Sequence, residues 1–215
     1  DISNRDMVDS HLRAIWLRAS GVRLDKAIAN VLDITAEGLP VRADIRASLN
    51  APGIIEKALP QAQSIFRSIR DSAHEPKPAW LMDDGYCARV LGQAYDFFDK
   101  AFETWRELFR SAQRAMDFYD RINRDLSESN EKRTEARHRY NEASRQLDAL
   151  VGSTGTNDDF YTYRYLAGQG FMPGYNFPRL PLVAWIPGEG DSMRSISRPR
   201  FLALTEFGPR SSIYH

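Results

Sequence analysis

One apolar stripe with the spacing of a heptad repeat constrains this sequence more than any other feature. The stripe begins at Trp80, and its later members are separated mainly by three or four positions: Leu91, Tyr95, Phe98, Phe102, Trp105, Phe109, Ala112, Met116, Tyr119, Ile122 and Leu126. Side chains at this spacing share one face of an α-helix and form a seam for partner helices. The stripe therefore predicts one long helix from Trp80 to Leu126 that packs against other helices.

The same rhythm returns after a polar interruption at residues 127–135. Its second part consists of Ala136, Tyr140, Ala143, Leu147 and Leu150. Two serines and an asparagine near the start of the interruption favour caps and turns over helix interiors. We therefore predict an antiparallel helical hairpin that turns between Leu126 and Lys132.

A shorter apolar stripe precedes the long one. It contains Ala62, Ile65, Phe66, Ile69 and Ala73, and the prolines at 76 and 78 interrupt it. Because proline is common in the first turn of a helix, we expect this helix to begin at Pro60. A helix from Trp80 to Leu126 would be about 70 Å long, whereas the second helix of the hairpin would be only about 35 Å long. The second helix can therefore cover only the distal half of the long helix. We expect the helix that begins at Pro60 to cover the proximal half.

Residues 1–50 predict a helix followed by a second helix or a loop. Apolar residues at helical spacing in the first segment are Met7, Leu12, Ile15, Trp16 and Ala19. Gly21 is well placed to end this helix. A second amphipathic segment from Leu24 to Leu32 is followed by the Gly-Leu-Pro break at residues 38–40.

Residues 152–215 differ in character from the helical part, because arginine, aromatic residues, proline and glycine dominate and lysine is absent. Residues 152–157 have the composition of a flexible linker. We expect a short helix at residues 158–167. Apolar runs at 182–186 and 200–207 are bounded by proline and glycine and predict strands, with 191–197 as the connection of a hairpin.

Together these patterns predict a mainly α fold, with a long antiparallel helical hairpin or bundle and a small mixed α/β subdomain at the C-terminal end. Three parts are expected, namely residues 1–50, 51–151 and 152–215. The chain begins at Asp1 and ends in an apolar, strand-like run. Natural termini are usually polar and poorly ordered, so we interpret the chain as a fragment of a larger protein.

Composition narrows the class of protein. Twenty-nine Lys and Arg residues balance 29 Asp and Glu residues, so the chain lacks the global positive charge that marks many nucleic-acid-binding proteins. The single cysteine, Cys87, excludes an internal disulfide and fits a reducing compartment. No run of residues approaches 18 apolar positions. We expect a soluble, cytoplasmic protein without membrane contact.

The sequence contains no complete catalytic motif. Residues 152–156 are glycine-rich, but no Gly-Lys-Ser/Thr follows, so the lysine of a phosphate-binding loop is missing. Asp83 and Asp84 precede Gly85 and are more typical of a turn than of a magnesium site. Four scattered histidines and one cysteine do not have the spacing of a zinc site. We expect no catalytic residue, metal or cofactor in this chain.

A cluster of arginine and aromatic side chains in the C-terminal part is the candidate nucleic-acid site. Guanidinium groups suit phosphates, and aromatic faces accept unpaired bases. The candidate phosphate contacts are Arg164, Arg179, Arg198 and Arg200, and the candidate stacking faces are Tyr163 and Tyr175. The alternative is that the aromatic side chains fill a small core while the arginines pair with local acids.

The bulky centre of the heptad stripe is a candidate partner-docking face. It consists of Phe98, Phe102, Trp105 and Phe109. These side chains are too large for a lean two-stranded coiled coil. They indicate either the core of a thicker bundle or a face that docks the remainder of a parent protein.

Both ends of the chain carry a resemblance to a known family. Residues 160–167 (FYTYRYLA), 170–181 (GFMPGYNFPRLP) and 198–209 (RPRFLALTEFGP) resemble the region after the motor domains of large bacterial superfamily-2 helicases, notably the helicase of DISARM-type anti-phage systems. Residues 4–7 (NRDM) and 11–17 (HLRAIWL) are similar to the segment just after the second RecA-like domain. The resemblance covers about a third of the chain and leaves out the long helices.

This resemblance implies a parent protein that translocates on DNA with ATP and magnesium. The nucleotide-binding motifs are absent from these residues, so that activity would belong to the parent. The resemblance therefore implies a non-catalytic segment that frames the DNA path or docks partner subunits in anti-phage defence. Its partners would be the rest of the helicase, DNA and other defence-system subunits. The alternative function is a protein-interaction scaffold that uses the heptad face without DNA contact.

Overall fold

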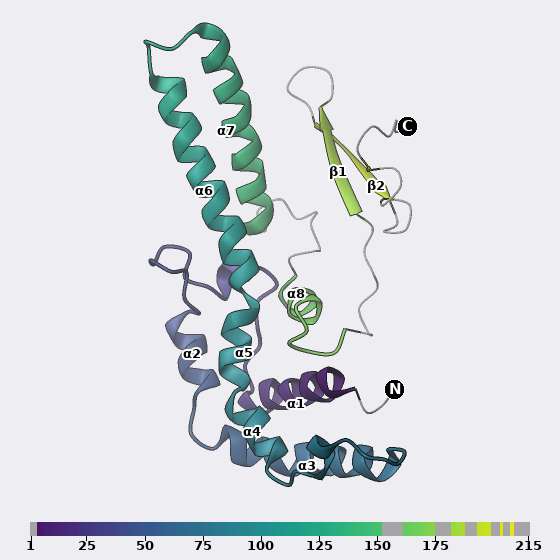
Figure 1. Ribbon diagram of the computed structural model, residues 1–215. Helices are drawn as coiled ribbons and strands as arrows, with labels where there is room; N and C mark the ends of the chain where they lie inside the picture. The colour runs from purple at the N-terminus through teal and green to yellow at the C-terminus, as the bar shows by residue number, and fades with distance from the viewer. Residues whose placement is uncertain are drawn as a thin grey trace. The chain divides into compact units, whose positions relative to one another are not determined.

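A computed structural model describes residues 4–151, 161–174, 182–187, 193–198, 203 and 207–208. The chain divides into two compact units, Asp1–Gly174 and Tyr175–His215. The helices of the first unit are α1 (Arg5–Ser20), α2 (Ala43–Leu49), α3 (Ile54–Ser72), α4 (Tyr86–Gly92), α5 (Ala94–Ala101), α6 (Glu103–Arg124), α7 (Asn130–Val151) and α8 (Thr162–Gly168) (Figure 1). The predicted mainly α fold is confirmed. No helix in the described ranges is long and apolar enough to cross a membrane.

The first predicted helix is confirmed as α1, and local signals define both of its ends. The Asn4 side chain accepts a hydrogen bond from the Met7 backbone N–H at 3.2 Å, which satisfies one of the free donors of the first turn. Gly21 has a φ of 71° and its N–H donates to the Arg18 carbonyl, as in a left-handed helix cap. The segment from Leu24 to Leu32 is mainly loop, with only the 3-10 helix Ile28–Asn30 in it.

The predicted single helix from Trp80 to Leu126 is wrong. The chain forms four elements there, namely the 3-10 helix Ala79–Met82, α4, α5 and α6. Gln93 and Phe102 interrupt the helical ladder with ψ values of 0° and −1°. A straight helix of about 70 Å would extend well beyond one small core. The interruptions let the aromatic residues of the stripe contribute to a core built with other elements. Leu126 lies beyond the end of α6 and is 83% exposed.

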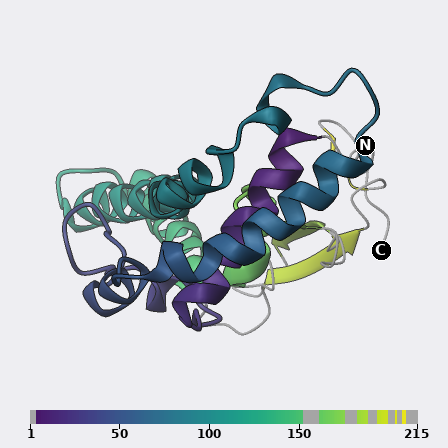
Figure 2. The ribbon, with the colours of Figure 1, turned by 90° about the horizontal axis from the view of Figure 1, so that it is seen from below.

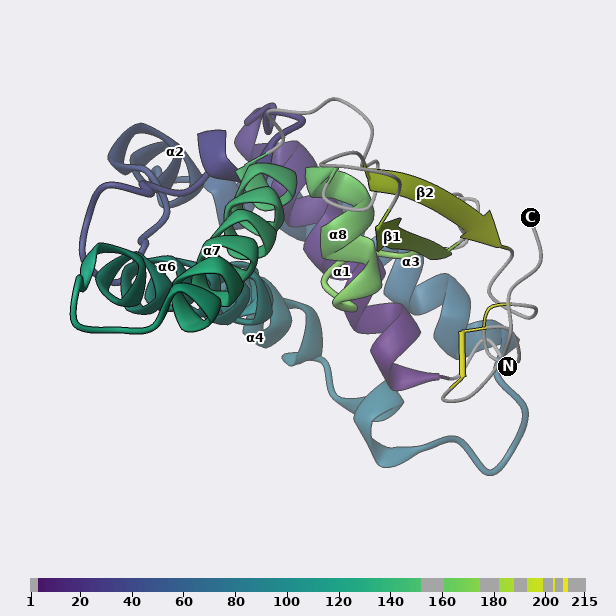
Figure 3. The same cartoon turned by 90° about the horizontal axis from the view of Figure 1, so that it is seen from above.

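The predicted hairpin is confirmed. Helices α6 and α7 lie side by side and are joined by residues 125–129 (Figures 1 and 3). In the turn, Asp125 accepts hydrogen bonds from the backbone N–H and the hydroxyl of Ser127. Ala136, Ala143 and Leu150 are buried at the predicted heptad positions. Small and polar residues at the interruption therefore ended the helix as their cap and turn preferences predict.

Helix α3 begins earlier than predicted, because Pro60 lies inside it rather than in its first turn. The helix starts after Gly53, which has a φ of 85°. Pro60 is exposed, so the carbonyl that its missing N–H leaves free can bind water. The predicted end before the prolines is confirmed at Ser72. Helix α3 packs on α1 and α4, and Figure 2 shows α1 and α3 next to each other.

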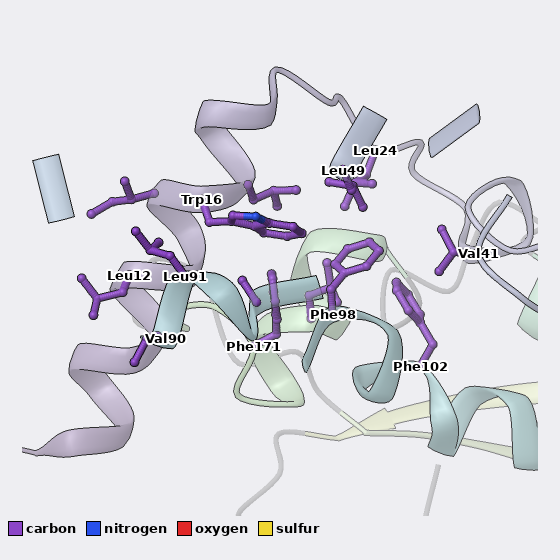
Figure 4. Close-up of a cluster of buried hydrophobic side chains, with 14 of the residues drawn as sticks. Leu12, Trp16, Leu24, Val41, Leu49, Val90, Leu91, Phe98, Phe102 and Phe171 are labelled. Atoms are coloured by element: carbon purple, nitrogen blue, oxygen red, sulfur yellow. The ribbon is translucent and has the colours of Figure 1, made fainter. Parts of the chain in front are cut away.

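The core of the first unit is aromatic. Trp16 of α1, Phe98 of α5 and Phe171, which follows α8, contact one another with ring centroids 5.4–6.4 Å apart (Figure 4). Phe102 stacks on Tyr165 of α8 at 5.9 Å. Aromatic pairs prefer such tilted and offset arrangements, and each ring removes a large apolar area from water. Three segments that are distant in sequence therefore meet in one core.

The second unit contains an antiparallel pair of strands, β1 (Leu182–Pro187) and β2 (Met193–Arg198). Strand β1 confirms the run predicted at 182–186, but β2 occupies residues predicted to be a connection. Four of the six residues of β2 are polar (Arg194, Ser195, Ser197 and Arg198), so the segment reads as a polar loop in the sequence. In the predicted strand at 200–207, Ala203 is helical and accepts a hydrogen bond from the Phe207 N–H.

Other predictions for the C-terminal part are tested only in part by the described residues. Helix α8 overlaps the short helix expected at 158–167 and ends one residue beyond it, at Gly168, whereas the expected linker at 152–157 lies outside the described residues. The two compact units divide after Gly174, and α8 belongs to the first of them. The mixed α/β subdomain stays a prediction.

Replacing Phe98 by alanine tests the core. Phe98→Ala should lower the free energy of unfolding by about 3–5 kcal/mol, because it removes a fully buried ring and leaves a cavity. The matched control is Phe118→Ala on α6, where the ring is 54% exposed and the expected change is within about 0.5 kcal/mol. Urea denaturation followed by circular dichroism measures both. Equal losses in the two variants would contradict the observed burial.

Candidate functional site

Backbone pairing attaches the start of α8 to the loop that follows α1. Ala27 and Tyr161 form an isolated antiparallel bridge. The carbonyl of Lys26 accepts hydrogen bonds from the backbone N–H and the hydroxyl of Thr162, at 2.9 and 3.1 Å. The hydroxyl of Tyr163 accepts a hydrogen bond from the Leu24 N–H at 3.1 Å. The beginning of α8 is therefore held at three successive residues.

A buried arginine connects α1 with the segment after α8. The Arg13 guanidinium donates to the Gly170 carbonyl at 3.2 Å and lies 3.6 Å from the Asp9 carboxylate. It also lies over the Phe97 ring, 4.1 Å from its centroid, at a distance typical of a cation–π contact. Burial lowers the pKa of Arg13, and the negative charge of Asp9 opposes that change. These contacts stabilise the position of a loop that carries Phe171.

Tyr165 of α8 caps the start of α6. The first N–H groups of any helix lack a carbonyl partner within the helix. Here the backbone N–H of Trp105, in the first turn of α6, donates to the Tyr165 hydroxyl at 3.0 Å. Burial raises the pKa of Tyr165, while the Trp105 N–H acts in the opposite direction. The interruption of the helical ladder at Phe102 is thus compensated by a residue from a distant part of the chain.

A second cluster surrounds Arg106, which is 5% exposed. Its Nε donates to the Leu39 carbonyl at 3.0 Å, and its two terminal nitrogens donate to Asp99 and Glu103. Arg110 joins Glu103 to the Gly38 carbonyl. Leu39 has a φ of 52°, a left-handed conformation that is uncommon for a residue with a side chain. The two arginines therefore clamp a strained loop onto α5 and α6.

A cleft of about 370 Å³ lies beside this clamp. Its lining residues are Glu37, Gly38, Pro40, Val41, Arg46, Tyr95, Asp99, Glu103 and Arg106. Burial raises the pKa of Tyr95, and Asp99 adds to this effect. Burial alone would raise the pKa of Glu103, but hydrogen bonds from Arg110 and Arg106 lower it overall. Since each nitrogen of Arg106 already has a protein partner, this arginine supports the loop.

The predicted docking face lies in the core. Phe98, Phe102, Trp105 and Phe109 are all at most 2% exposed. Their neighbours are aromatic rings of this chain, and Trp105 stacks on Phe109 at 5.1 Å. Of the two interpretations of these residues, core packing describes the structure, and no face of these side chains remains for a second protein.

The predicted nucleic-acid residues are distributed over both units. Tyr163 and Arg164 lie together in the first turn of α8, and both are half-buried. Arg198 is the last residue of β2, opposite Leu182 of β1, and belongs to the second unit. Tyr175, Arg179 and Arg200 lie outside the described residues.

Several polar residues at the centre of the structure carry no sequence signal that distinguishes them. They are Arg13, Tyr86, Arg106 and Tyr165. Each binds a group distant in sequence, so a periodic pattern along one helix does not reveal the partner. Across the described ranges, no group of histidine, cysteine and carboxylate side chains could hold a metal ion.

The comparisons with known proteins add no further constraint. The chain matches no family model, no curated protein and no solved structure. Assignment of a function therefore depends on the described geometry and on the motifs in the sequence.

Replacing Arg106 by alanine tests the clamp. Arg106→Ala should lower the free energy of unfolding by about 1–3 kcal/mol, because the buried Leu39 carbonyl loses its donor. The matched control is Arg114→Ala, which removes an exposed arginine of the same helix that makes no contact with the loop and should change the free energy of unfolding by no more than about 0.5 kcal/mol. Hydrogen exchange should become faster at residues 33–41 in the first variant alone. Unchanged exchange in Arg106→Ala would show that the loop holds its conformation without the clamp.

The environment of Tyr86 in α4 makes the stability of the folded chain depend on pH. The Tyr86 hydroxyl donates to Asp9 at 2.5 Å and accepts from Arg5 at 3.1 Å. Burial, followed by the bond to Asp9, raises the pKa of Tyr86 to about 12, above its ordinary value of 10. The neutral form is therefore favoured in the folded state. Its stabilisation is complete below pH 10 and is lost as the pH rises from 10 towards 12.

The Tyr86→Phe variant keeps the ring and removes this ionisation. At pH 8 it should be less stable than the unaltered protein by about 1–3 kcal/mol, because Asp9 loses a donor. At pH 11 that difference should shrink by on the order of 1 kcal/mol. Urea denaturation at the two pH values measures the difference. A difference that stays constant would mean that Tyr86 titrates alike in the folded and unfolded states.

Proposed function

We propose that this chain is a non-catalytic segment of an ATP-dependent superfamily-2 DNA helicase, and that it frames the DNA path or docks partner subunits. One observation carries the proposal. Two of the stretches that resemble the post-motor region of such helicases, residues 11–17 and the stretch that begins at Gly170, are far apart in sequence and contact each other in the first unit. Trp16 contacts Phe171, and Arg13 donates to the Gly170 carbonyl.

The helices between these stretches have the geometry of an insertion. The chain leaves the shared framework after Ala27 and returns to it at Tyr161, and these two residues pair with each other. An insertion with adjacent ends adds little loop-closure entropy to the framework that carries it. This arrangement supports a family-like framework that joins α1 to α8 and to which the α6–α7 hairpin is added, in agreement with a resemblance that leaves out the long helices.

In this proposal the parent is a cytoplasmic helicase of the DISARM anti-phage type, and its motor domains bind ATP and magnesium. The second unit belongs to a small mixed α/β subdomain. Arg164, Arg179, Arg198 and Arg200 contact phosphates, and Tyr163 and Tyr175 offer stacking faces. The rest of the helicase, DNA and other defence-system subunits are the partners.

A protein-interaction scaffold without DNA contact is the second candidate. The observation that favours it is apolar exposure on the α6–α7 hairpin, where Phe118 is 54% and Leu126 is 83% exposed. Because the aromatic part of the heptad face is buried, such a scaffold would use the outer surface of the hairpin. Exposed apolar residues mark interaction sites when they form a continuous patch, whereas scattered single residues are common on any surface.

Replacing the four arginines by alanine tests the DNA-binding proposal. The quadruple variant should bind single- and double-stranded DNA more weakly with little dependence on base sequence. The slope of log affinity against log salt should fall by about one for each phosphate that the variant no longer binds. Fluorescence anisotropy at several salt concentrations measures both quantities.

The matched control replaces four exposed basic residues of the first unit, Lys57, Lys100, Arg114 and Arg145, by alanine. It removes the same charge and should retain the salt slope of the unaltered chain. Unchanged affinity and slope in the test variant, with the protein folded, would show that the four arginines are structural. The scaffold function would then be the better proposal.

A further inference from the structure

The bridge between Ala27 and Tyr161 also gathers charged and aromatic side chains on the surface of the first unit. From the loop come Arg23 and Lys26, and from the start of α8 come Tyr161, Tyr163 and Arg164. Arg23 and Lys26 are exposed, and the three residues of α8 and its cap are half-buried. These five residues are called the bridge patch below. They come from segments about 135 residues apart, and only the fold brings them together.

Arg23 and Lys26 contribute two exposed positive charges to the bridge patch. Arg23 and Lys26 form no ion pair with any residue in the described part of the chain. The one acidic residue between them, Asp25, accepts hydrogen bonds from the Ala27 N–H at 2.9 Å and from the Asn30 amide at 3.1 Å. Asp25 therefore stabilises the loop, and its charge offsets only part of the charge of its neighbours.

The two tyrosines of the patch are held in place. Their ring centroids are 6.1 Å apart and their planes are inclined by 42°. The Tyr163 hydroxyl is bound to the Leu24 N–H, and the backbone of Tyr161 pairs with Ala27. Rings that are already ordered lose little conformational freedom when a ligand stacks on them. Half-exposed aromatic rings beside exposed cations are the combination found in proteins that bind single strands.

We propose that the bridge patch binds single-stranded nucleic acid, with Arg23 and Lys26 on the phosphates and Tyr161 stacked on an unpaired base. This inference rests on the proposed function and adds Arg23, Lys26 and Tyr161 to the residues that the sequence suggests. A duplex fits less well, because its bases are already stacked on one another and their faces are not accessible to a tyrosine ring.

The test uses the full 215-residue chain and a fluorescent oligothymidylate, with anisotropy measured at several salt concentrations. The variant Arg23→Ala/Lys26→Ala should lower the salt slope by about 0.7 for each phosphate contact, or about 1.4 for the pair. The control Lys57→Ala/Arg114→Ala removes the same charge from α3 and α6. At about 0.1 M salt, charges more than about 10 Å from the strand are largely screened, so the control should keep the original slope.

Stacking is tested separately at Tyr161. Tyr161→Ala should weaken binding about fivefold or more, whereas Tyr161→Phe retains an aromatic face and should bind like the unaltered chain. Both variants keep the backbone bridge to Ala27. Circular dichroism and urea denaturation establish that each variant is folded before its affinity is compared.

Three outcomes would overturn the inference. If Arg23→Ala/Lys26→Ala behaves like its control while the quadruple arginine variant loses affinity, DNA binding stands but the bridge patch is not the site. If the unaltered chain does not bind the oligothymidylate at about 50 mM salt, where phosphate contacts are strong, both this inference and DNA binding fail. Equal binding of a polyglutamate peptide, with no effect of Tyr161→Ala, would indicate an acidic protein partner.

Discussion

Phe98 lies between Trp16 and Phe171, and the rest of the first unit depends on this contact among three aromatic rings. The rings come from α1, α5 and the segment after α8, which are the beginning, middle and end of the unit. Each ring removes a large apolar area from water, so their packing offsets much of the entropy lost in bringing distant segments together. The same core contains Phe102 and Trp105 at the start of α6, and it therefore fixes the position of the first turn of the α6–α7 hairpin.

Buried polar side chains supply hydrogen-bond partners for backbone groups that the aromatic packing buries. A bent helix and a strained loop expose backbone groups that need partners when they are buried. Tyr165 accepts from the N–H of Trp105 where α6 starts, and Arg106 donates to the carbonyl of Leu39 where the loop adopts a left-handed conformation. These two hydrogen bonds connect α8 and the loop at Leu39 to α6. Removal of either side chain would leave a buried backbone group without a hydrogen-bond partner.

The aromatic residues that pack the core are different from the exposed residues that a partner could contact. The aromatic centre of the heptad stripe is used within the chain, which removes it as a docking face. Among the described residues, the surfaces that we propose for recognition are the outer face of the hairpin and the bridge patch at Ala27 and Tyr161. The residues proposed for recognition are therefore not the aromatic residues with the strongest periodic signal, which are buried.

Local signals in the sequence were sufficient to predict the helical class, the end of α1 at Gly21, the end of α3 and the α6–α7 hairpin. Periodicity and capping residues act over a few positions, so a single segment contains all the information needed. The tertiary structure, by contrast, breaks the stripe at Gln93 and Phe102 and places Pro60 within a helix. It also decided that the polar run at β2 pairs as a strand. A heptad pattern predicts which face of a helix is buried but not which segment packs against it. The packing partner is determined by contacts between segments that are distant in sequence.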